Sequence, residues 1–220
     1  MKREKYLTTL LIICIASYFI MFNMCMTADA EDMLTVPIAA SGRLKGDSVV
    51  ISLKNIYLGE QRLNKYISQI SKLKYDECDL LVQECKKNEI DPFIVLGLIK
   101  RESNFNPRAV GMSGERGLGQ LMENTAKPVA KNLGYIYDPN KLFDTRYNLK
   151  LTITQLAYLY NIYEGDINKA LTAYNRGQQG LIDYIKEGKS AYNNPAMSDY
   201  SVKVLEFAAA YKEEFVKLLK

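Results

Sequence analysis

Apolar positions recur at intervals of three and four residues along most of the chain after residue 75, which is the spacing of one helical face. Glycine and proline separate these segments, and the alternating pattern of a half-buried strand is nearly absent. The sequence therefore predicts a mostly α domain. Its helices are expected at residues 79–87, 92–103, 124–132, 145–163, 167–174, 178–187 and 200–218.

Residues that start and stop helices support these limits. The pair Asp91-Pro92 is a strong helix start, because Asp accepts hydrogen bonds from free amides and Pro is tolerated in the first turn. Asn106-Pro107 is expected to end that helix, and Gly134 is placed to cap the helix before it. Residues 145–163 are predicted to form the longest helix.

The region before the helical domain has a different composition. Residues 31–59 mix polar residues with glycine and proline, and one short run, Val49–Leu53, is β-like. We interpret this region as a spacer with little structure of its own, followed by a linking helix at 60–73. The chain is thus divided into an N-terminal segment (1–30), a spacer with linking helix (31–74) and a single domain (75–215).

The N-terminal segment has the pattern of a membrane-targeting sequence. Met1–Lys5 carries three positive charges, and Tyr6–Ala28 carries none of either sign. Ala28-Asp29-Ala30 resembles the cleavage site of a signal peptide, whereas the length suits an uncleaved anchor helix, since ~20 apolar residues span ~30 Å of hydrocarbon. Under both interpretations the rest of the chain is exported, and an anchor would add contact with the membrane.

Composition removes several classes of chemistry. The chain has no histidine, which excludes imidazole acid–base catalysis, Ser-His-Asp systems and HExxH zinc sites. Proton transfer must then use Asp, Glu, Tyr, Lys or Cys. Cys78 and Cys85 would lie ~10 Å apart on one helix, too far for a disulfide, so we expect buried thiols and no metal or other cofactor. The net charge of +4 gives no dense basic stripe, so nucleic acid is not an expected partner.

Glu102 is the first candidate for such chemistry. Val95, Leu98, Ile99 and Glu102 follow the spacing of one helical face, so the carboxyl group continues the apolar stripe. Burial disfavours a charged carboxylate and raises its pKa, which suits a general acid at neutral pH. The alternative is a frayed helix end at which the carboxylate pairs with a nearby arginine.

A glycine-rich loop follows this helix. Four glycines lie between residues 111 and 119, where they permit close approach of backbone to a ligand or a turn through positive φ. A phosphate-binding loop is not predicted, because no strand precedes the glycines and no Gly-Lys-Ser/Thr follows. Leucine and methionine alternate with the glycines, which indicates a packed loop that would fix Gln120 on a wall able to hydrogen-bond a sugar.

Several short segments, taken in order, resemble the soluble-lytic-transglycosylase (SLT) family. The resemblance spans about residues 76–210, and the segments that carry it are 102–107 (ESNFNP), 109–110 (AV), 117–122 (GLGQLM), 125–126 (TA), 173–177 (AYNRG) and Tyr200 with the valines after it. In isolation a segment such as AYNRG is equally typical of a helix C-terminus. Four blocks at family-like spacing are far more specific than any one of them.

The resemblance implies a goose-lysozyme-like fold that cuts the β-1,4 bond between N-acetylmuramic acid and N-acetylglucosamine in peptidoglycan. It implies that Glu102 acts first as general acid and then as base, that the substrate's acetamido group assists, and that the product carries a 1,6-anhydro ring. By position, the residues implied to bind substrate are Ser103, Gly117, Leu118, Gln120, Tyr174, Asn175 and Tyr200.

The chain departs from the family pattern at four positions. Gly111 replaces a frequent Ser, Glu115 a frequent Ala, Gly119 a frequent Met and Glu123 a frequent Pro. We expect Gly119 to widen the cleft or loosen the loop. Glu115 either places a second carboxylate near the site or lies at a solvated loop tip.

Two other functions remain open from the sequence. One is a hydrolytic muramidase that uses Glu102 with a second acid such as Glu115 or Asp144. The other is a non-catalytic muropeptide-binding component of an envelope-spanning machine, which would have no need of the Glu102 carboxyl group.

Overall fold

The computed structural model describes residues 44–219, with side chains from residue 57 onward. The predicted targeting segment at 1–30 and the first part of the spacer lie outside the described residues. No helix in the described part of the chain combines the length and the apolar character needed to cross a membrane. Residues 52–219 form one compact unit.

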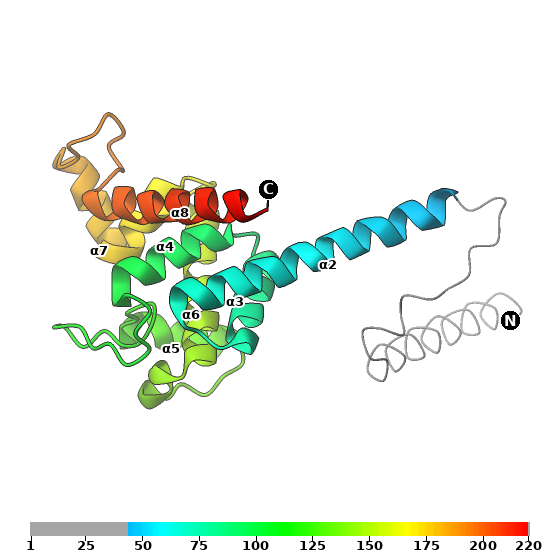
Figure 1. The fold of residues 1–220 in the computed structure, drawn as a ribbon. Helices are drawn as coiled ribbons and strands as arrows, with labels where there is room; N and C mark the ends of the chain where they lie inside the picture. The colour runs from blue at the N-terminus through cyan, green and yellow to red at the C-terminus, as the bar shows by residue number, and fades with distance from the viewer. Residues whose placement is uncertain (1–43, 220) are drawn as a thin grey trace, which may run out of the picture. The chain divides into compact units, whose positions relative to one another are not determined.

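The described residues are helical, as the sequence predicts, with connecting loops and two isolated β-bridges in the loop after α4 (Figure 1). The elements are α2 (Leu44–Ser71), α3 (Tyr75–Lys87), α4 (Pro92–Ser103), α5 (Glu123–Asn132), the 3-10 helix η2 (Pro139–Phe143), α6 (Thr145–Ile162), α7 (Ile167–Lys186) and α8 (Asp199–Leu218).

The prediction for the spacer is wrong in its second half. α2 begins at Leu44, so the β-like run Val49–Leu53 and Gly59 both lie inside a helix. β-branched residues favour a strand only where a neighbouring strand offers pairing and packing, and residues 44–219 contain no extended strand. α2 has 28 residues and α6 has 18, so the prediction that α6 is the longest helix is also wrong.

α4 is the central helix of the unit, and its ends are those that the sequence predicts to within three residues. The Asp91 side chain accepts a hydrogen bond from the Phe93 amide at 2.9 Å, as expected for a helix start. The helix ends at Asn104, whose φ of 51° places it in the left-handed region. Five of the residues between these ends are fully buried apolar side chains or nearly so, namely Phe93, Val95, Leu96, Leu98 and Ile99.

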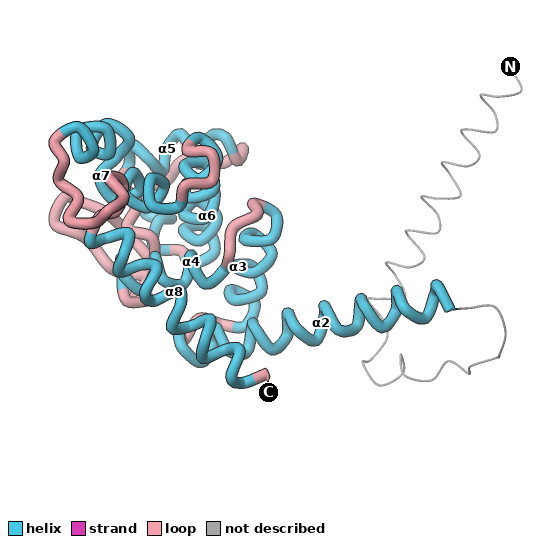
Figure 2. Tube along the Cα trace, turned by 90° about the horizontal axis from the view of Figure 1, so that it is seen from above, coloured by secondary structure: helices cyan, strands magenta, loops and turns pink. Residues whose placement is uncertain are grey.

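α4 and α8 run antiparallel and in close contact, as the two views of the molecule agree (Figures 1 and 2). Gly97 makes this contact possible. A Cβ atom at Gly97 would lie 3.0 Å from the Ala208 amide nitrogen and closer still to the Val204 carbonyl oxygen. The absence of a side chain therefore lets the two backbones touch, and this contact brings the end of α4 to the start of α8.

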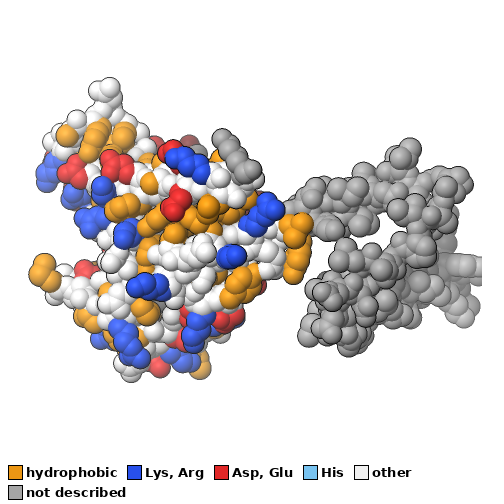
Figure 3. Space-filling model, viewed as in Figure 1, with side chains coloured by type: hydrophobic (Ala, Val, Ile, Leu, Met, Phe, Trp, Pro, Cys, Tyr) orange, Lys and Arg blue, Asp and Glu red, His pale blue; other side chains and the backbone are white. Residues whose placement is uncertain are grey.

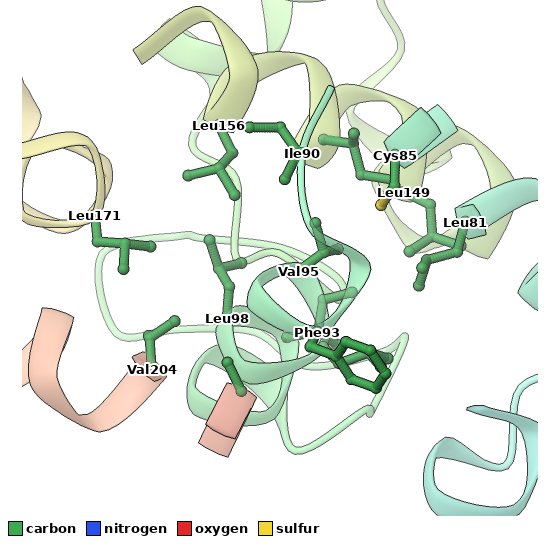
Figure 4. Packing of buried hydrophobic residues seen from close by; sticks show 14 of the residues in the cluster. Leu81, Cys85, Ile90, Phe93, Val95, Leu98, Leu149, Leu156, Leu171 and Val204 are labelled. Carbon is green, nitrogen blue, oxygen red and sulfur yellow. The ribbon is translucent and has the colours of Figure 1, made fainter. Parts of the chain in front are cut away.

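The main core fills the space between α3, α4, α6, α7 and α8 (Figure 4). Cys78 and Cys85 are buried free thiols within it, as predicted. A smaller cluster joins α5 and η2 to α6 through Val129, Leu142 and Leu151. α6 therefore has one buried face in each cluster and is the element to which both halves of the domain attach.

α7 contains a break where the sequence predicts the boundary between two helices. Gly177 has φ 75° and ψ 165°, which is not helical. Only glycine adopts such a conformation without strain. The segments before and after Gly177 therefore correspond to the two predicted helices at 167–174 and 178–187.

Candidate active site

Glu102 lies in the last turn of α4 and is partly buried. The Tyr200 hydroxyl, from the first turn of α8, donates a hydrogen bond to Glu102 Oε1. Among the described residues no salt bridge joins Glu102 to an arginine, and Arg101 instead lies over the Tyr200 ring, 5.8 Å from its centroid. The structure thus favours the buried carboxyl group over the paired one.

Burial raises the pKa of Glu102 from its usual 4.5 to about 7. Desolvation is the largest cause, and the negative charge of Glu115 adds to it. The Tyr200 hydrogen bond and the Arg101 charge act in the opposite direction, because both stabilise the carboxylate. A carboxyl group with a pKa near 7 can donate a proton and later accept one at neutral pH.

Tyr200 is held in place by the start of α8. Ser198 caps this helix through the Ser201 amide, and the Ser198 hydroxyl lies 2.8 Å from the Thr172 hydroxyl of α7. Thr172 also donates to the Ala196 carbonyl at 2.7 Å. These buried hydrogen bonds fix the first turn of α8 on α7, so the Tyr200 hydroxyl has one defined position opposite Glu102.

Tyr174 of α7 connects the glutamate to the glycine-rich loop. Its hydroxyl donates to the Gly119 carbonyl at 2.9 Å. Burial raises the pKa of Tyr174 well above its usual value, and the negative charge of Glu102 raises it further. The same two causes, burial first, raise the pKa of Tyr200. Both phenols therefore remain protonated and act as hydrogen-bond donors beside the carboxyl group.

The loop of residues 108–121 is fixed by Asn148 of α6, which the sequence analysis did not identify. Asn148 is fully buried, and its amide nitrogen donates to the Arg116 and Leu142 carbonyls at 3.1 and 2.9 Å. Its oxygen accepts from the Gly119 amide at 2.9 Å. A polar residue on the apolar stripe of α6 was the available signal, since a buried amide requires several partners.

Gly119 does not widen the cleft, contrary to our expectation. A Cβ atom at Gly119 would lie 2.8 Å from Thr152 Cγ2 and would overlap its hydroxyl. The Gly119 amide and carbonyl are both hydrogen-bonded, to Asn148 and Tyr174. Thr152 fills the space that a larger residue at 119 would need, and the loop is not loosened.

The structure brings some of the predicted binding residues together and separates others. Gln120 has φ 47°, and its side-chain Nε2 donates to the Ala109 and Gly117 carbonyls at 3.1 and 2.9 Å. Leu118 is fully buried in the main core, so only its backbone can face a ligand. Ser103 donates to the Ile99 carbonyl at 3.2 Å within its own helix.

The remaining predicted positions are Gly117 and Asn175. Gly117 is buried with φ 76°, and its amide donates to the Ala109 carbonyl at 2.9 Å. Asn175 is exposed and lies two residues before the break in α7. Glu102, Tyr174, Tyr200 and Gln120, with the backbone of residues 117–119, thus form the part of the site with defined contacts.

The face of the molecule in Figure 3 is hollowed at its left edge. The hollow lies between the loop that follows α4, below, and the end formed by α7 and α8, above, and Lys and Arg side chains gather along its upper margin. In the described part of the chain no group of three or more Cys, Asp and Glu side chains is arranged to hold a metal ion. The candidate site thus consists of the Glu102 carboxyl group, the Tyr174 and Tyr200 phenols, the Gln120 side chain and the backbone of residues 117–119.

The helical architecture matches the lysozyme-like SLT fold seen in solved structures. The family model of the transglycosylase SLT domain matches residues 79–197, which is more than half of the chain. The protein therefore belongs to the SLT-domain family.

Solved structures of larger proteins share the fold. An inactive variant of the lytic transglycosylase Slt from Pseudomonas aeruginosa aligns with 61% of this chain at 23% identity and a TM-score of 0.53. The 70 kDa soluble lytic transglycosylase from Escherichia coli aligns with 61% at 22% identity and a TM-score of 0.54. A complex of the 70 kDa enzyme with bulgecin A aligns with 83% at 16% identity and a TM-score of 0.51. The chain covers 23%, 24% and 38% of these three chains.

Proposed function

We propose that this protein is a peptidoglycan lytic transglycosylase that cleaves the β-1,4 bond between N-acetylmuramic acid and N-acetylglucosamine. The observation that supports the proposal most is Glu102 itself, a carboxyl group with a pKa of about 7 that accepts from Tyr200 and whose charge acts on Tyr174. Membership of the SLT-domain family supports the substrate class.

The first step is protonation of the leaving group. Glu102 transfers its proton to the glycosidic oxygen, the bond to the muramyl C1 breaks, and N-acetylglucosamine leaves with a free hydroxyl. The substrate's own acetamido oxygen bonds to C1, which removes the need for a second protein carboxylate as nucleophile. Tyr200 donates to the carboxylate that Glu102 has become and stabilises its new charge.

The second step uses the same group as base. Glu102 removes the proton from the muramyl C6 hydroxyl, and that oxygen displaces the acetamido oxygen at C1 to close a 1,6-anhydro ring. The reaction consumes no water, and Glu102 ends protonated, as it began. A pKa close to ambient pH serves both directions of transfer, because neither protonation state is strongly disfavoured.

The substrate is proposed to lie in the hollow next to the loop of residues 108–121. The Gly119 amide and carbonyl are hydrogen-bonded to Asn148 and Tyr174, and the Gly117 amide and carbonyl to Ala109 and Gln120. Gln120 donates inward to backbone, so its side-chain oxygen is the group left to accept from a sugar hydroxyl or acetamido N–H. We propose Ser103 and Asn175 as peripheral contacts at the two ends of this wall.

Hydrolytic cleavage is the second candidate, and one observation favours it. The negative charge of Glu115 reaches Glu102, so a second carboxylate lies on the same side of the domain. Asp144 does not fill this role, because its carboxylate caps α6 through the Tyr147 amide at 2.8 Å and the residue lines a groove with residues 70–74, away from Glu115.

Mass spectrometry of glycan fragments from purified cell wall tests the proposal. The full chain is expected to release fragments with 1,6-anhydro-muramyl ends, whereas ordinary reducing ends would identify a muramidase. Glu102→Gln should abolish release while retaining binding to the wall. The matched control is Glu89→Gln, an exposed glutamate at the end of α3. Full lytic activity in Glu102→Gln would exclude Glu102 as the proton donor.

We also propose that the catalytic domain occupies residues 75–215, that the second half of α2 packs on it, and that the protein acts outside the cytoplasm. Tyr66 of α2 supports the packing, since its ring lies 5.5 Å from that of Phe215 in α8. Export rests on the targeting pattern at 1–30 and on the location of the proposed substrate. N-terminal sequencing of the exported protein distinguishes a cleaved signal peptide from an uncleaved anchor.

A further inference from the structure

Two of the departures from the family pattern, Gly111 and Glu115, occupy one volume in the structure. A Cβ atom at Gly111 would lie 2.9 Å from the carboxyl carbon of Glu115 and would overlap Glu115 Oε2. The φ of Gly111 lies outside the left-handed region, so its backbone would accept any L-residue without strain. A side chain at 111 would require the Glu115 carboxylate, the end of a flexible side chain, to move away from the Ser113 amide.

The Glu115 carboxylate is held in this place by its own loop. Glu115 Oε2 accepts from the Ser113 amide at 3.0 Å, and the Glu115 carbonyl accepts from the Gly111 amide at 2.9 Å. The exposed tip of the loop is formed by Met112–Gly114, whereas Glu115 is only half exposed. Glu115 therefore lies beside the exposed tip, and its carboxylate is hydrogen-bonded to a residue of that tip.

The space above Gly111 borders the proposed cleft wall. A Cβ atom at Gly111 would lie 3.0 Å from Gln120 Oε1, so the side-chain oxygens of Glu115 and Gln120 both lie next to Gly111. The charged and titratable groups that act on Glu102 are Arg101 from α4, Tyr200 from α8 and Glu115 from this loop, and Tyr174 of α7 senses the Glu102 charge in turn.

We propose that Glu115 is a positioning residue for the reaction of Glu102: its carboxylate, seated over Gly111 in place of a side chain at that position, puts a fixed negative charge on the cleft wall. The proposal rests on the proposed function. Its physical consequence is electrostatic, because a fixed anion opposes ionisation of a nearby acid, whereas Arg101 favours it. The effect of a substitution at Gly111 then depends on whether Glu115 is present.

The electrostatic part is tested by the pH dependence of wall lysis in Glu115→Gln. Glutamine keeps the acceptor for the Ser113 amide and removes the charge. Glu102 acts as an acid, so activity falls as pH rises through its pKa, and removal of a neighbouring anion moves this alkaline limb to lower pH. A shift of about half a pH unit is expected, since Glu115 is the smallest of the four causes that act on Glu102.

Three results would overturn the positioning role. One is an alkaline limb that stays where it is in wild type. The second is loss of turnover at every pH in Glu115→Gln. The third is a wild type that releases reducing-end products while Glu115→Gln releases anhydro products, which would make Glu115 a catalytic base. Glu89→Gln, which changes the same charge at a distance, is the matched control and should leave the profile unchanged.

The steric part is tested by thermal unfolding of four full-length chains: wild type, Gly111→Ser, Glu115→Ala and the double variant. Gly111→Ser alone should lower Tm by about 2–4 °C, because the serine Cβ displaces the Glu115 carboxylate from the Ser113 amide and one hydrogen bond is lost. In the Glu115→Ala background the same serine should cost little. Equal costs in the two backgrounds would refute the pairing.

The unfolding cycle needs no enzymatic activity, so it separates this inference from the proposed function. If wild type released no anhydro products but the cycle showed coupling, the proposed function would fail and the Gly111–Glu115 pairing would stand. If wild type released anhydro products and the cycle were additive, the Gly111–Glu115 pairing would fail and the proposed function would stand.

Discussion

Replacement of Glu102 by glutamine is predicted to stabilise the folded domain above neutral pH while it abolishes lysis. The cause is the difference between the pKa of Glu102 in the folded domain, about 7, and its usual value of 4.5. At pH values between 4.5 and about 7, Glu102 is mostly ionised in the unfolded chain but mostly protonated in the folded domain. Glutamine has no charge to bury, and its side-chain oxygen can still accept from Tyr200.

The magnitude follows from linkage between ionisation and folding. A group whose pKa is raised on folding costs nothing below the unfolded value, costs progressively more up to the folded value, and costs a constant amount above it. One unit of pKa corresponds to about 1.36 kcal/mol, so the full penalty in wild type is about 3 kcal/mol. For a domain of this size that corresponds to a Tm difference of about 6–12 °C.

Thermal unfolding of wild type and Glu102→Gln between about pH 4 and pH 9 measures this difference. The two Tm values should nearly coincide at the acidic end, separate between the two pKa values and stay apart above the higher one, with Glu102→Gln the more stable. Glu89→Gln controls for the loss of one carboxylate and should show no such separation. A Tm difference that is the same at every pH would refute the reasoning, because it would mean that Glu102 ionises equally easily in both states.

Three further substitutions test individual contacts. Tyr200→Phe removes the hydrogen bond that stabilises the Glu102 carboxylate, so the pKa of Glu102 should rise and the alkaline limb of lysis should move up by about one pH unit; a limb that moves down would contradict the assigned direction. Gly119→Met should destabilise the loop because Thr152 fills the space, and Thr152→Gly in the same chain should recover part of the lost Tm; failure to recover any would show that another contact excludes the side chain. Gly97→Ala should lower the free energy of unfolding by about 2 kcal/mol or more in urea titration, because its Cβ meets the α8 backbone; an unchanged midpoint would show that the two helices can separate at no cost.

Local sequence signals were sufficient for most of the fold. The helices from α3 to α8 were predicted to within a few residues, because each has an amphipathic repeat and a recognisable start or stop such as Asp91 or Gly177. The error at Val49–Leu53 came from reading β propensity without knowing whether a partner strand exists. Propensity of this kind takes its value from neighbours, and the neighbours are set by the tertiary fold.

Composition and helical spacing were enough to predict a helical domain, proton transfer without histidine and a Glu102 that continues an apolar stripe. Contacts between distant segments add that Tyr200, 98 residues away, donates to that carboxyl group, that Thr152 takes the space beside Gly119, and that Glu115 lies over Gly111. A helical repeat records which face is buried but not what that face meets. The pKa of a carboxyl group depends on the desolvation, donors and charges around it, and these come from segments that are brought together only when the chain folds.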